Sequence, residues 1–315
     1  MDGGSSNDDI LTGARCSDPI IKNRMRHCPI YMSLPPATKM RAFVRHLRPA
    51  SKPKQMSTKT QSLITLFDIP TAKGAETWSP NVWRIRMALN YKRLPYQTQW
   101  VEYPDIGKVG QEIGAKPTTP NPDGSGTLLW TCPMIIDPNH IDSDGKPTVI
   151  SDSIVIAKYL DEVYPERKVI PEGTDALYNV WSQFIGQNIT GKLASLLVPL
   201  CPNVLSERGK EYFITTREKW WGPLDKMCPD REKGWAGVQE GLNKVAAALD
   251  ANGEGDEKRL RVIPGREWYA DFTLIAPLLW ASTIVDKKEL EALRGWNDGR
   301  WGKILDSHAE VLRIE

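Results

Sequence analysis

The sequence predicts an α/β domain followed by an all-helical domain. The chain has 315 residues, and a length of about 150 residues per domain favours two domains, each large enough for its own core. Strand-like apolar runs occur only before about residue 165, whereas helical spacing of apolar residues fills the chain from about residue 175 onward. Strands mixed with helices and then helices alone are typical of two separately packed units.

The first three elements form a βαβ unit. An apolar run over 63–69, ended by a proline, is typical of a buried strand. Ser79 followed by Pro80 predicts a helix start, because serine caps helices and proline suits the first helical position. Apolar spacing extends this helix to residue 90. Alternation over 96–103 predicts a second strand, parallel to the first with a right-handed crossover.

The α/β domain continues to a hairpin and a final helix. Its later elements are expected as a short helix over 105–115, a Pro/Gly/Asn-rich loop over 117–126, strands over 132–137 and 147–150, and a helix over 154–163. The Asp-Ser-Asp-Gly run between the last two strands has the chemistry of a hairpin turn. Ser151, Asp152 and Ser153 are good capping residues for the last helix.

The remainder of the chain is predicted to be helical. Helices are expected over 177–197, 206–220, 235–249, 272–285 and 301–313. No sequence repeat is evident.

Residues 1–61 form a basic extension that we expect to be disordered, since they show no sustained apolar period. They contain eleven Lys or Arg and four Asp, so the body of the chain carries 30 basic and 35 acidic residues. A net charge of −5 there argues against a nucleic-acid partner. A start of the native protein at Met56 is an equally good interpretation, while an organellar transit peptide fits poorly with the acidic first nine residues.

Composition excludes several further classes. No apolar stretch approaches the roughly 18 residues of a membrane span, and no signal peptide is recognisable. The five cysteines form no CxxC pair and the four histidines have no metal-ligand spacing, which predicts a metal-free protein of a reducing compartment, the cytoplasm. The dinucleotide-binding motif GxGxxG, the Walker loop, the zinc motif HExxH and the hydrolase motif GxSxG do not occur in positions that would indicate those functions.

The element order βαβαββα followed by a helical domain, with Pro133 at the start of the third strand, resembles the glutathione S-transferase family. Ser79, Cys132-Pro133, Asp152-Ser153 and Asp271 carry the resemblance. The run Trp78-Ser79-Pro80-Asn81 is similar to the fungal etherase-like, serine-type subgroup related to bacterial β-aryl-etherases. The resemblance implies a thioredoxin-like glutathione-binding domain over 62–165 and a helical substrate-binding domain over 176–315.

The resemblance gives Ser79 the role of stabilising the glutathione thiolate. A free thiol with a pKa near 8.5 is mostly protonated at neutral pH, and a hydroxyl at the positive end of a helix favours the anion. Asn81 is the alternative donor, and plain helix capping is the alternative role for Ser79. Relatives that carry out thiol–disulfide exchange have a cysteine at this position. The serine found here therefore favours conjugation. Trp78 is a candidate for contacting a hydrophobic substrate.

The resemblance assigns four further residues to glutathione. The Cys132–Pro133 bond is expected to be cis, which frees the backbone of Cys132 to pair with the cysteinyl part of glutathione, while the thiol is a buried bystander. At the next helix start, Ser153 would hold the γ-glutamyl carboxylate and Asp152 would approach its ammonium group. Simple strand opening by Pro133 and simple capping by Ser151 or Asp152 are the alternatives.

The sequence departs from the family pattern at one position. In the family a Ser or Thr stands three residues before the helical-domain aspartate and completes a capping box, but Trp268 stands three residues before Asp271. The missing hydroxyl removes one capping hydrogen bond, worth about 1 kcal/mol. We expect the effect to fall on folding more than on chemistry.

The resemblance implies a homodimeric, detoxification-type transferase that attacks hydrophobic or aromatic electrophiles with glutathione as its co-substrate. Cleavage of β-aryl ethers is the narrower prediction. A non-catalytic, ligandin-like binding protein of the same fold is the first alternative, and a regulatory or assembly protein is the second. The electrophile and the dimer geometry do not follow from the sequence.

Overall fold

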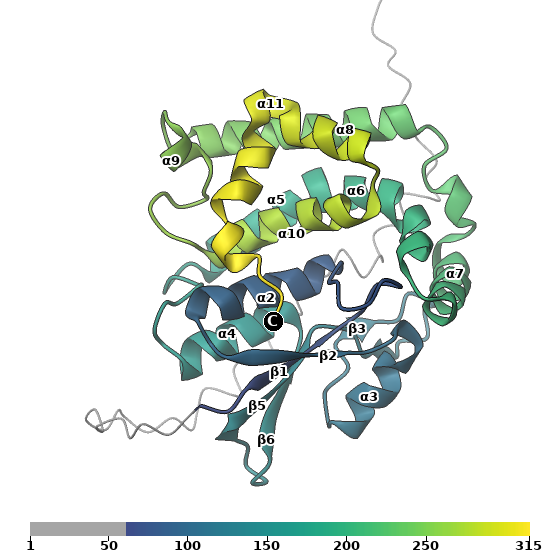
Figure 1. Cartoon of the computed structure of the whole chain (residues 1–315), viewed down its shortest axis with the longest axis vertical. Coiled ribbons are helices and arrows are strands. Elements are labelled where there is room, and N and C mark those ends of the chain that lie inside the picture. The colour runs from purple at the N-terminus through teal and green to yellow at the C-terminus, as the bar shows by residue number, and fades with distance from the viewer. Residues whose placement is uncertain (1–60) are drawn as a thin grey trace, which may run out of the picture.

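The structure is a computed structural model and describes residues 61–315. The extension predicted for residues 1–61 therefore lies, except for its last residue, outside the described part. A twisted sheet with its helices forms one half of the molecule, and a stack of helices forms the other half (Figure 1).

The sheet is mixed, with the strand order β2-β1-β5-β6. Its strands are β1 (Ile64–Asp68), β2 (Tyr96–Trp100), β5 (Met134–Ile141) and β6 (Pro147–Ser151). β1 and β2 are parallel, as predicted for the βαβ unit, and the β5 pairings are antiparallel. With α2 (Pro80–Lys92), α3 (Ile106–Glu112) and α4 (Ser153–Val163) the order is that of a thioredoxin-like domain. This part of the predicted fold is confirmed.

Three details of the predicted strands were wrong. The second strand ends at Trp100 rather than at residue 103, and Tyr103–Asp105 is a 3₁₀ turn because Pro104 has no N–H for a ladder. The predicted loop contains half of a short antiparallel pair, β3 (Thr119–Pro120) with β4 (Leu128–Leu129). The third strand extends to Ile141 past an irregularity in its pairing with β6.

The rest of the described chain is helical, as predicted. Its helices are α5 (Asp175–Ile185), α6 (Gly191–Leu197), α7 (Glu207–Trp221), α8 (Arg231–Asp250), α9 (Asp256–Arg259), α10 (Tyr269–Ile284) and α11 (Lys287–Ser307). No helix among residues 61–315 is long and apolar enough to cross a membrane. No group of His, Cys, Asp or Glu in the same range has the arrangement of a metal site.

One continuous helix predicted over 177–197 is divided by a π turn, Gly186–Thr190. At this turn α8 approaches so closely that a Cβ added to Gly241 would lie 1.8 Å from the carbonyl oxygen of Asn188. Only glycine permits this approach. The wide turn is therefore coupled to packing against a helix about fifty residues away, which no local pattern encodes.

The C-terminal helix predicted over 301–313 was also wrong. α11 begins at Lys287, bends through residues 296–299, and ends at Ser307. The chain then runs back to the thioredoxin-like domain (Figure 1), where Asn90 Nδ2 donates to the carbonyl oxygens of Val311 at 2.8 Å and Arg313 at 2.9 Å. The C-terminus thus fastens the two halves together.

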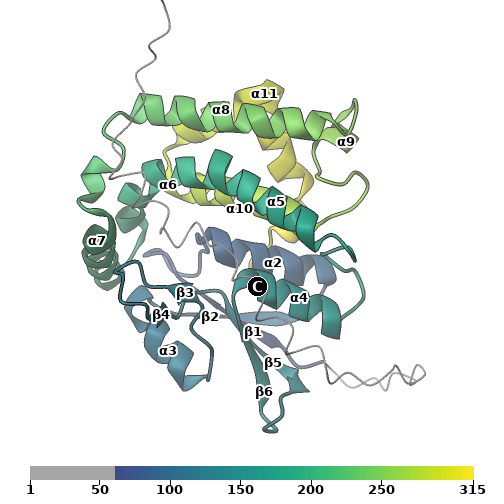
Figure 2. The same ribbon diagram turned by 180° about the vertical axis from the view of Figure 1, so that it is seen from behind.

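The two halves also meet where α10 packs on α2 (Figures 1 and 2). α10 is buried on every side from Tyr269 to Ala281, as expected for a helix that is apolar all round. It is the central helix of the molecule, and its starting point is fixed by a polar network.

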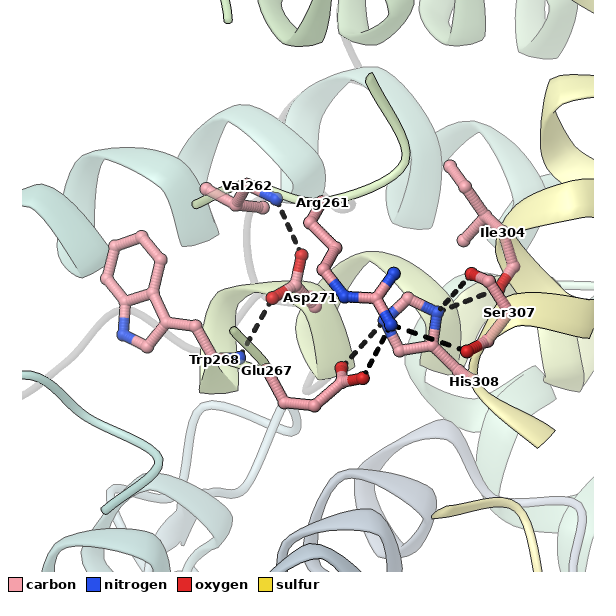
Figure 3. A network of polar contacts seen from close by, with 8 residues as sticks. All are labelled: Arg261, Val262, Glu267, Trp268, Asp271, Ile304, Ser307 and His308. Atoms are coloured by element: carbon pink, nitrogen blue, oxygen red, sulfur yellow. Dashed lines mark hydrogen bonds and ion pairs between the residues drawn. The ribbon is translucent and has the colours of Figure 1, made fainter. Parts of the chain in front are cut away.

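Figure 3 shows that network, which includes Asp271. Its carboxylate accepts hydrogen bonds from the backbone N–H groups of Val262 at 2.7 Å and Trp268 at 2.9 Å. Trp268 has no side-chain acceptor, so the hydroxyl half of the capping box is missing as predicted. The Asp271 N–H donates instead to the Trp268 carbonyl oxygen at 2.9 Å. The backbone therefore replaces the expected side-chain cap.

His308 completes the network from the end of α11. It is 1% exposed, its Nε2 lies 2.9 Å from Glu267 Oε2, and its Nδ1 lies 2.8 Å from the carbonyl oxygen of Ile304. Each ring nitrogen therefore lies within hydrogen-bond distance of an oxygen atom. Burial alone would raise the pKa of Glu267, but the hydrogen bond and charge of His308 outweigh it and hold that pKa below its ordinary value.

Candidate functional site

Three segments that are distant in sequence meet at one edge of the sheet. Met134, the first residue of β5, pairs with Phe67 near the end of β1 and with Ser151 at the end of β6. β1 and β6 therefore run in the same direction and end at the edge where β5 begins. The chain continues from β1 toward α2 and from β6 directly into α4, so both helix N-termini are directed to this edge. Helix N-termini favour bound anions.

Ser79 lies at the N-cap of α2, with Pro80 in the first helical position, as predicted. The residue is 7% exposed. Its backbone carbonyl accepts the first helical hydrogen bond, from the Trp83 N–H at 3.0 Å, but its side chain makes no capping hydrogen bond. The hydroxyl is thus not engaged in capping. Asn81, the alternative donor, is half-buried in the first turn of the same helix.

Trp78 is 3% exposed and directly precedes Ser79. The centroid of its ring lies 6.1 Å from that of Tyr103, which follows β2. Its indole N–H has no hydrogen-bond partner within residues 61–315. Trp78 therefore forms part of an aromatic contact that begins at the start of α2.

The Cys132–Pro133 peptide bond is cis, as predicted. Cys132 is 5% exposed, and burial raises the pKa of its thiol far above the ordinary value, with the charge of Asp68 adding to the shift. A thiol in this environment stays protonated and does not act as a nucleophile. The interpretation of Cys132 as a chemically inert neighbour of the site is consistent with this burial.

Asp152 has a positive φ of 76° at the N-cap of α4. One carboxylate oxygen, Oδ1, accepts hydrogen bonds from the N–H groups of Ile154 at 3.0 Å and Val155 at 3.3 Å. Asp152 therefore does cap the helix, which was the alternative role considered for it. Burial raises the pKa of this carboxyl, while the two N–H groups and the charge of Arg84 act in the opposite direction.

Comparison with known proteins decides the family. Residues 78–163 match the model of the glutathione S-transferase N-terminal domain, and residues 176–310 match that of the C-terminal domain. The chain belongs to the glutathione S-transferase family. A glutathione S-transferase-like protein of Aspergillus flavus, ustS, is 34% identical over 235 residues, which cover 71% of this chain and 82% of that protein.

Solved fungal glutathione transferases share the whole architecture. GSTFuA3 from Phanerochaete chrysosporium is 31% identical with a TM-score of 0.74, and the match covers 81% of this chain and 100% of that one. A glutathione S-transferase of Ceriporiopsis subvermispora, solved in complex with glutathione, is 36% identical with a TM-score of 0.72. That match covers 81% of this chain and 99% of the other. This chain is thus similar along its described length to fungal family members.

The sequence analysis missed two residues that lie near the candidate site. Arg84, one turn beyond Ser79 in α2, interacts electrostatically with Asp152. Tyr269, fully buried at the start of α10, interacts electrostatically with both Arg84 and Asp152, and its hydroxyl has no hydrogen-bond partner within residues 61–315. A positive charge near a helix N-terminus is unfavourable. The position of Arg84 in the sequence could therefore have indicated a functional role. Tyr269 gave none, because a tyrosine in an apolar helix predicts only burial.

Proposed function

We propose that this protein is a glutathione transferase in which Ser79 stabilises the glutathione thiolate. The observation that carries the proposal is the Ser79 hydroxyl, which sits at the N-terminus of α2 and makes no capping hydrogen bond to its own helix. A hydroxyl donor and the unpaired N–H groups of the first turn favour an anion there by up to about 2 kcal/mol. That stabilisation lowers the pKa of the bound thiol toward neutral pH.

In the proposed reaction the thiolate sulfur attacks an electrophilic carbon of a hydrophobic or aromatic substrate. A carbon–sulfur bond forms, and the leaving group departs with the electron pair of the bond that breaks. In the narrower, etherase-type version the broken bond is an aryl ether and the leaving group is a phenolate, which then takes a proton from water. Subgroup similarity around Trp78 and Ser79 supports this version.

The glutathione subsite that we propose uses the other residues at the same sheet edge. The backbone beside the cis Cys132–Pro133 bond is placed to pair with the cysteinyl part of glutathione. Ser153 and the first N–H groups of α4 suit a carboxylate, and Asp152 offers its second carboxylate oxygen to an ammonium group. The glutathione bound to the Ceriporiopsis subvermispora relative supports the choice of ligand.

Replacement of Ser79 by alanine tests the proposal. We expect Ser79→Ala to lower the rate of conjugation by about 10- to 100-fold, which corresponds to the loss of a hydrogen bond to the thiolate worth about 1.4 to 2.7 kcal/mol. Glutathione affinity should change less than the rate, because the peptide contacts remain. Ser143→Ala, in the exposed turn after β5, serves as the control. An unchanged rate in Ser79→Ala, with a loss in Asn81→Ala, would transfer the role to Asn81. Saturable ligand binding without any turnover would favour the ligandin-like alternative.

We also propose that the protein is a homodimer. Val155 in α4 is 49% exposed, and Leu177 and Val180 in α5 are 64% and 69% exposed. An ion pair between Lys158 and Asp175 joins the same two helices, so the apolar side chains belong to neighbouring elements. Light scattering of wild type and Val180→Glu tests the dimer, which the added charge should dissociate.

We further propose a cytoplasmic location. Cys132 and Cys201 are buried and form no disulfide, which supports this location.

A further inference from the structure

Arg217 differs from the other buried cations of the described chain. Four Lys or Arg residues among residues 61–315 are more than nine-tenths buried. Three of them pair with a carboxylate, namely Arg86 with Asp68 at 2.8 Å, Lys92 with Asp161 at 2.8 Å and Arg300 with Asp250 at 2.7 Å. Arg217, 8% exposed, forms no ion pair within this range. Buried charges are normally paired, because an uncompensated charge in a protein interior is costly.

Aromatic rings and hydroxyl groups surround the Arg217 guanidinium. It lies 4.4 Å from the ring centroid of Phe213, 4.6 Å from that of Tyr103 and 4.8 Å from that of Trp220. Nη2 donates to the Tyr103 hydroxyl at 2.8 Å, and Nη1 donates to Thr216 Oγ1 at 2.8 Å. These neutral contacts hold the guanidinium in place without neutralising it. The arrangement is that of a cation positioned for an anion.

The Arg217 environment is continuous with the candidate active site. Tyr103 contacts Trp78, which precedes Ser79, and it lies within electrostatic range of Cys132. α7, which carries Arg217, runs along the side of the molecule in both views (Figures 1 and 2). It packs against the turn Tyr103–Asp105. Two aromatic rings, Tyr103 and Trp78, therefore connect Arg217 to Ser79, the residue proposed to stabilise the glutathione thiolate.

We propose that Arg217 binds a carboxylate on the electrophilic substrate, so that the substrate class is aromatic compounds that carry a carboxylate group. A guanidinium matches a carboxylate in charge and in its planar pair of donors. Tyr103, Phe213 and Trp220 offer aromatic surface for the body of the same molecule. The inference rests on the proposed transferase function and names the substrate class of that site.

The test compares two probes that differ only in charge. The full-length protein, saturated with glutathione, is titrated with 4-phenylbutyrate and with its neutral amide, and tryptophan fluorescence reports binding because Trp220 adjoins Arg217. We expect wild type to bind the carboxylate about tenfold more tightly than the amide, and Arg217→Met to reduce this preference to within about twofold. Ser79→Ala should keep the preference, so the result does not depend on catalysis.

Other outcomes would overturn the proposal. Equal affinity of wild type for the two probes would show that Arg217 is not an anion site, and this comparison needs no variant. A weaker affinity of Arg217→Met for glutathione, with the probe preference intact, would assign the cation to the glycyl carboxylate of glutathione instead.

Arg217→Lys keeps the charge and should keep part of the preference for the carboxylate probe. This variant therefore distinguishes a lost charge from a damaged fold. Absence of turnover in wild type would remove the transferase proposal but not the carboxylate site.

Discussion

Met134 in β5 lies opposite Ser151 in β6, and this pairing places the cis Cys132–Pro133 bond beside the start of α4. The same Met134 pairs with Phe67 in β1 on its other side. Three chain segments therefore converge on one edge because the register of two antiparallel strand pairs brings them there. A register shift of one residue would turn every side chain of β5 to the opposite face of the sheet.

Asp152 is predicted to combine a structural role with a binding role, and the two are separable. Its Oδ1 accepts both capping hydrogen bonds, so Asp152→Asn keeps the cap and removes only the charge. Asparagine, like aspartate, is among the residues that adopt a positive φ more readily than most, as this position requires. We expect Asp152→Asn to weaken glutathione binding at least about tenfold, or 1.4 kcal/mol, in calorimetric titration.

Asp152→Ala supplies the comparison, because it removes both roles. It should weaken glutathione binding similarly and also lower the free energy of unfolding by about 1 kcal/mol. If Asp152→Asn binds glutathione as wild type does, the carboxylate acts only as a helix cap, which was the alternative considered for it.

Much of the fold followed from the sequence because its signals are local. Ser79 and Pro80 mark the start of α2 by their own chemistry, and the hairpin between β5 and β6 follows from the turn chemistry of the residues between them. The edge where the site lies was not predicted, because it depends on the strand order β2-β1-β5-β6, which is set by pairing between segments distant in sequence.

The features that were missed depend on contacts distant in sequence. Asn90 binds the carbonyl of Val311, 221 residues away, and the π turn before α6 is packed against Gly241. Neither of these two contacts produces a periodic pattern in the sequence. Arg217 has no distinguishing signal in the sequence, because only the folded chain reveals that it is buried without a carboxylate.

The ion pair between Asp68 and Arg86 should determine whether α2 stays on the sheet. Both side chains are fully buried, and Arg86 Nη2 lies 2.8 Å from Asp68 Oδ2. The pair joins the end of β1 to α2, the helix that begins after Ser79. Arg86→Met leaves the Asp68 carboxylate buried without a counter-ion, and we expect a loss of about 3–5 kcal/mol in urea unfolding. Arg294→Met, which breaks an exposed pair with Asp306, should cost less than about 1 kcal/mol. Similar losses in the two variants would contradict a special role for the buried pair.

The C-terminal segment should stabilise the protein through Asn90. Deletion of residues 309–315 removes both carbonyl acceptors of its buried amide, and an unsatisfied buried donor costs about 1–3 kcal/mol. We expect at least this loss in the free energy of unfolding, measured with urea. Asn90→Leu in the truncated chain should recover part of the loss, since it removes the unsatisfied group. Equal stability of the full-length and truncated proteins would mean that these hydrogen bonds contribute nothing net.

Asp271 is predicted to make stability depend on pH in the acidic range. Burial raises the pKa of its carboxyl to about 7, against the hydrogen bonds from Val262 and Trp268 and the charge of His308, whereas the unfolded chain has a pKa of about 3.9. Between these values the folded protein holds a proton that the unfolded chain releases. The contribution of Asp271 to stability is therefore complete below about pH 4 and is lost as pH rises through about 7.

The Asp271→Asn variant tests this prediction. It has no titration at this position, so its free energy of unfolding should change with pH less steeply than that of wild type between about pH 4 and 7, by up to about 1.4 kcal/mol per pH unit. Its overall stability should also fall by about 1–3 kcal/mol, because the amide offers one oxygen where the carboxylate accepted two N–H groups. Asp144→Asn, in an exposed turn, is the matched control. Parallel pH profiles of Asp271→Asn and wild type would show that Asp271 is ionised throughout, and that its two N–H donors and His308 outweigh the cost of burial.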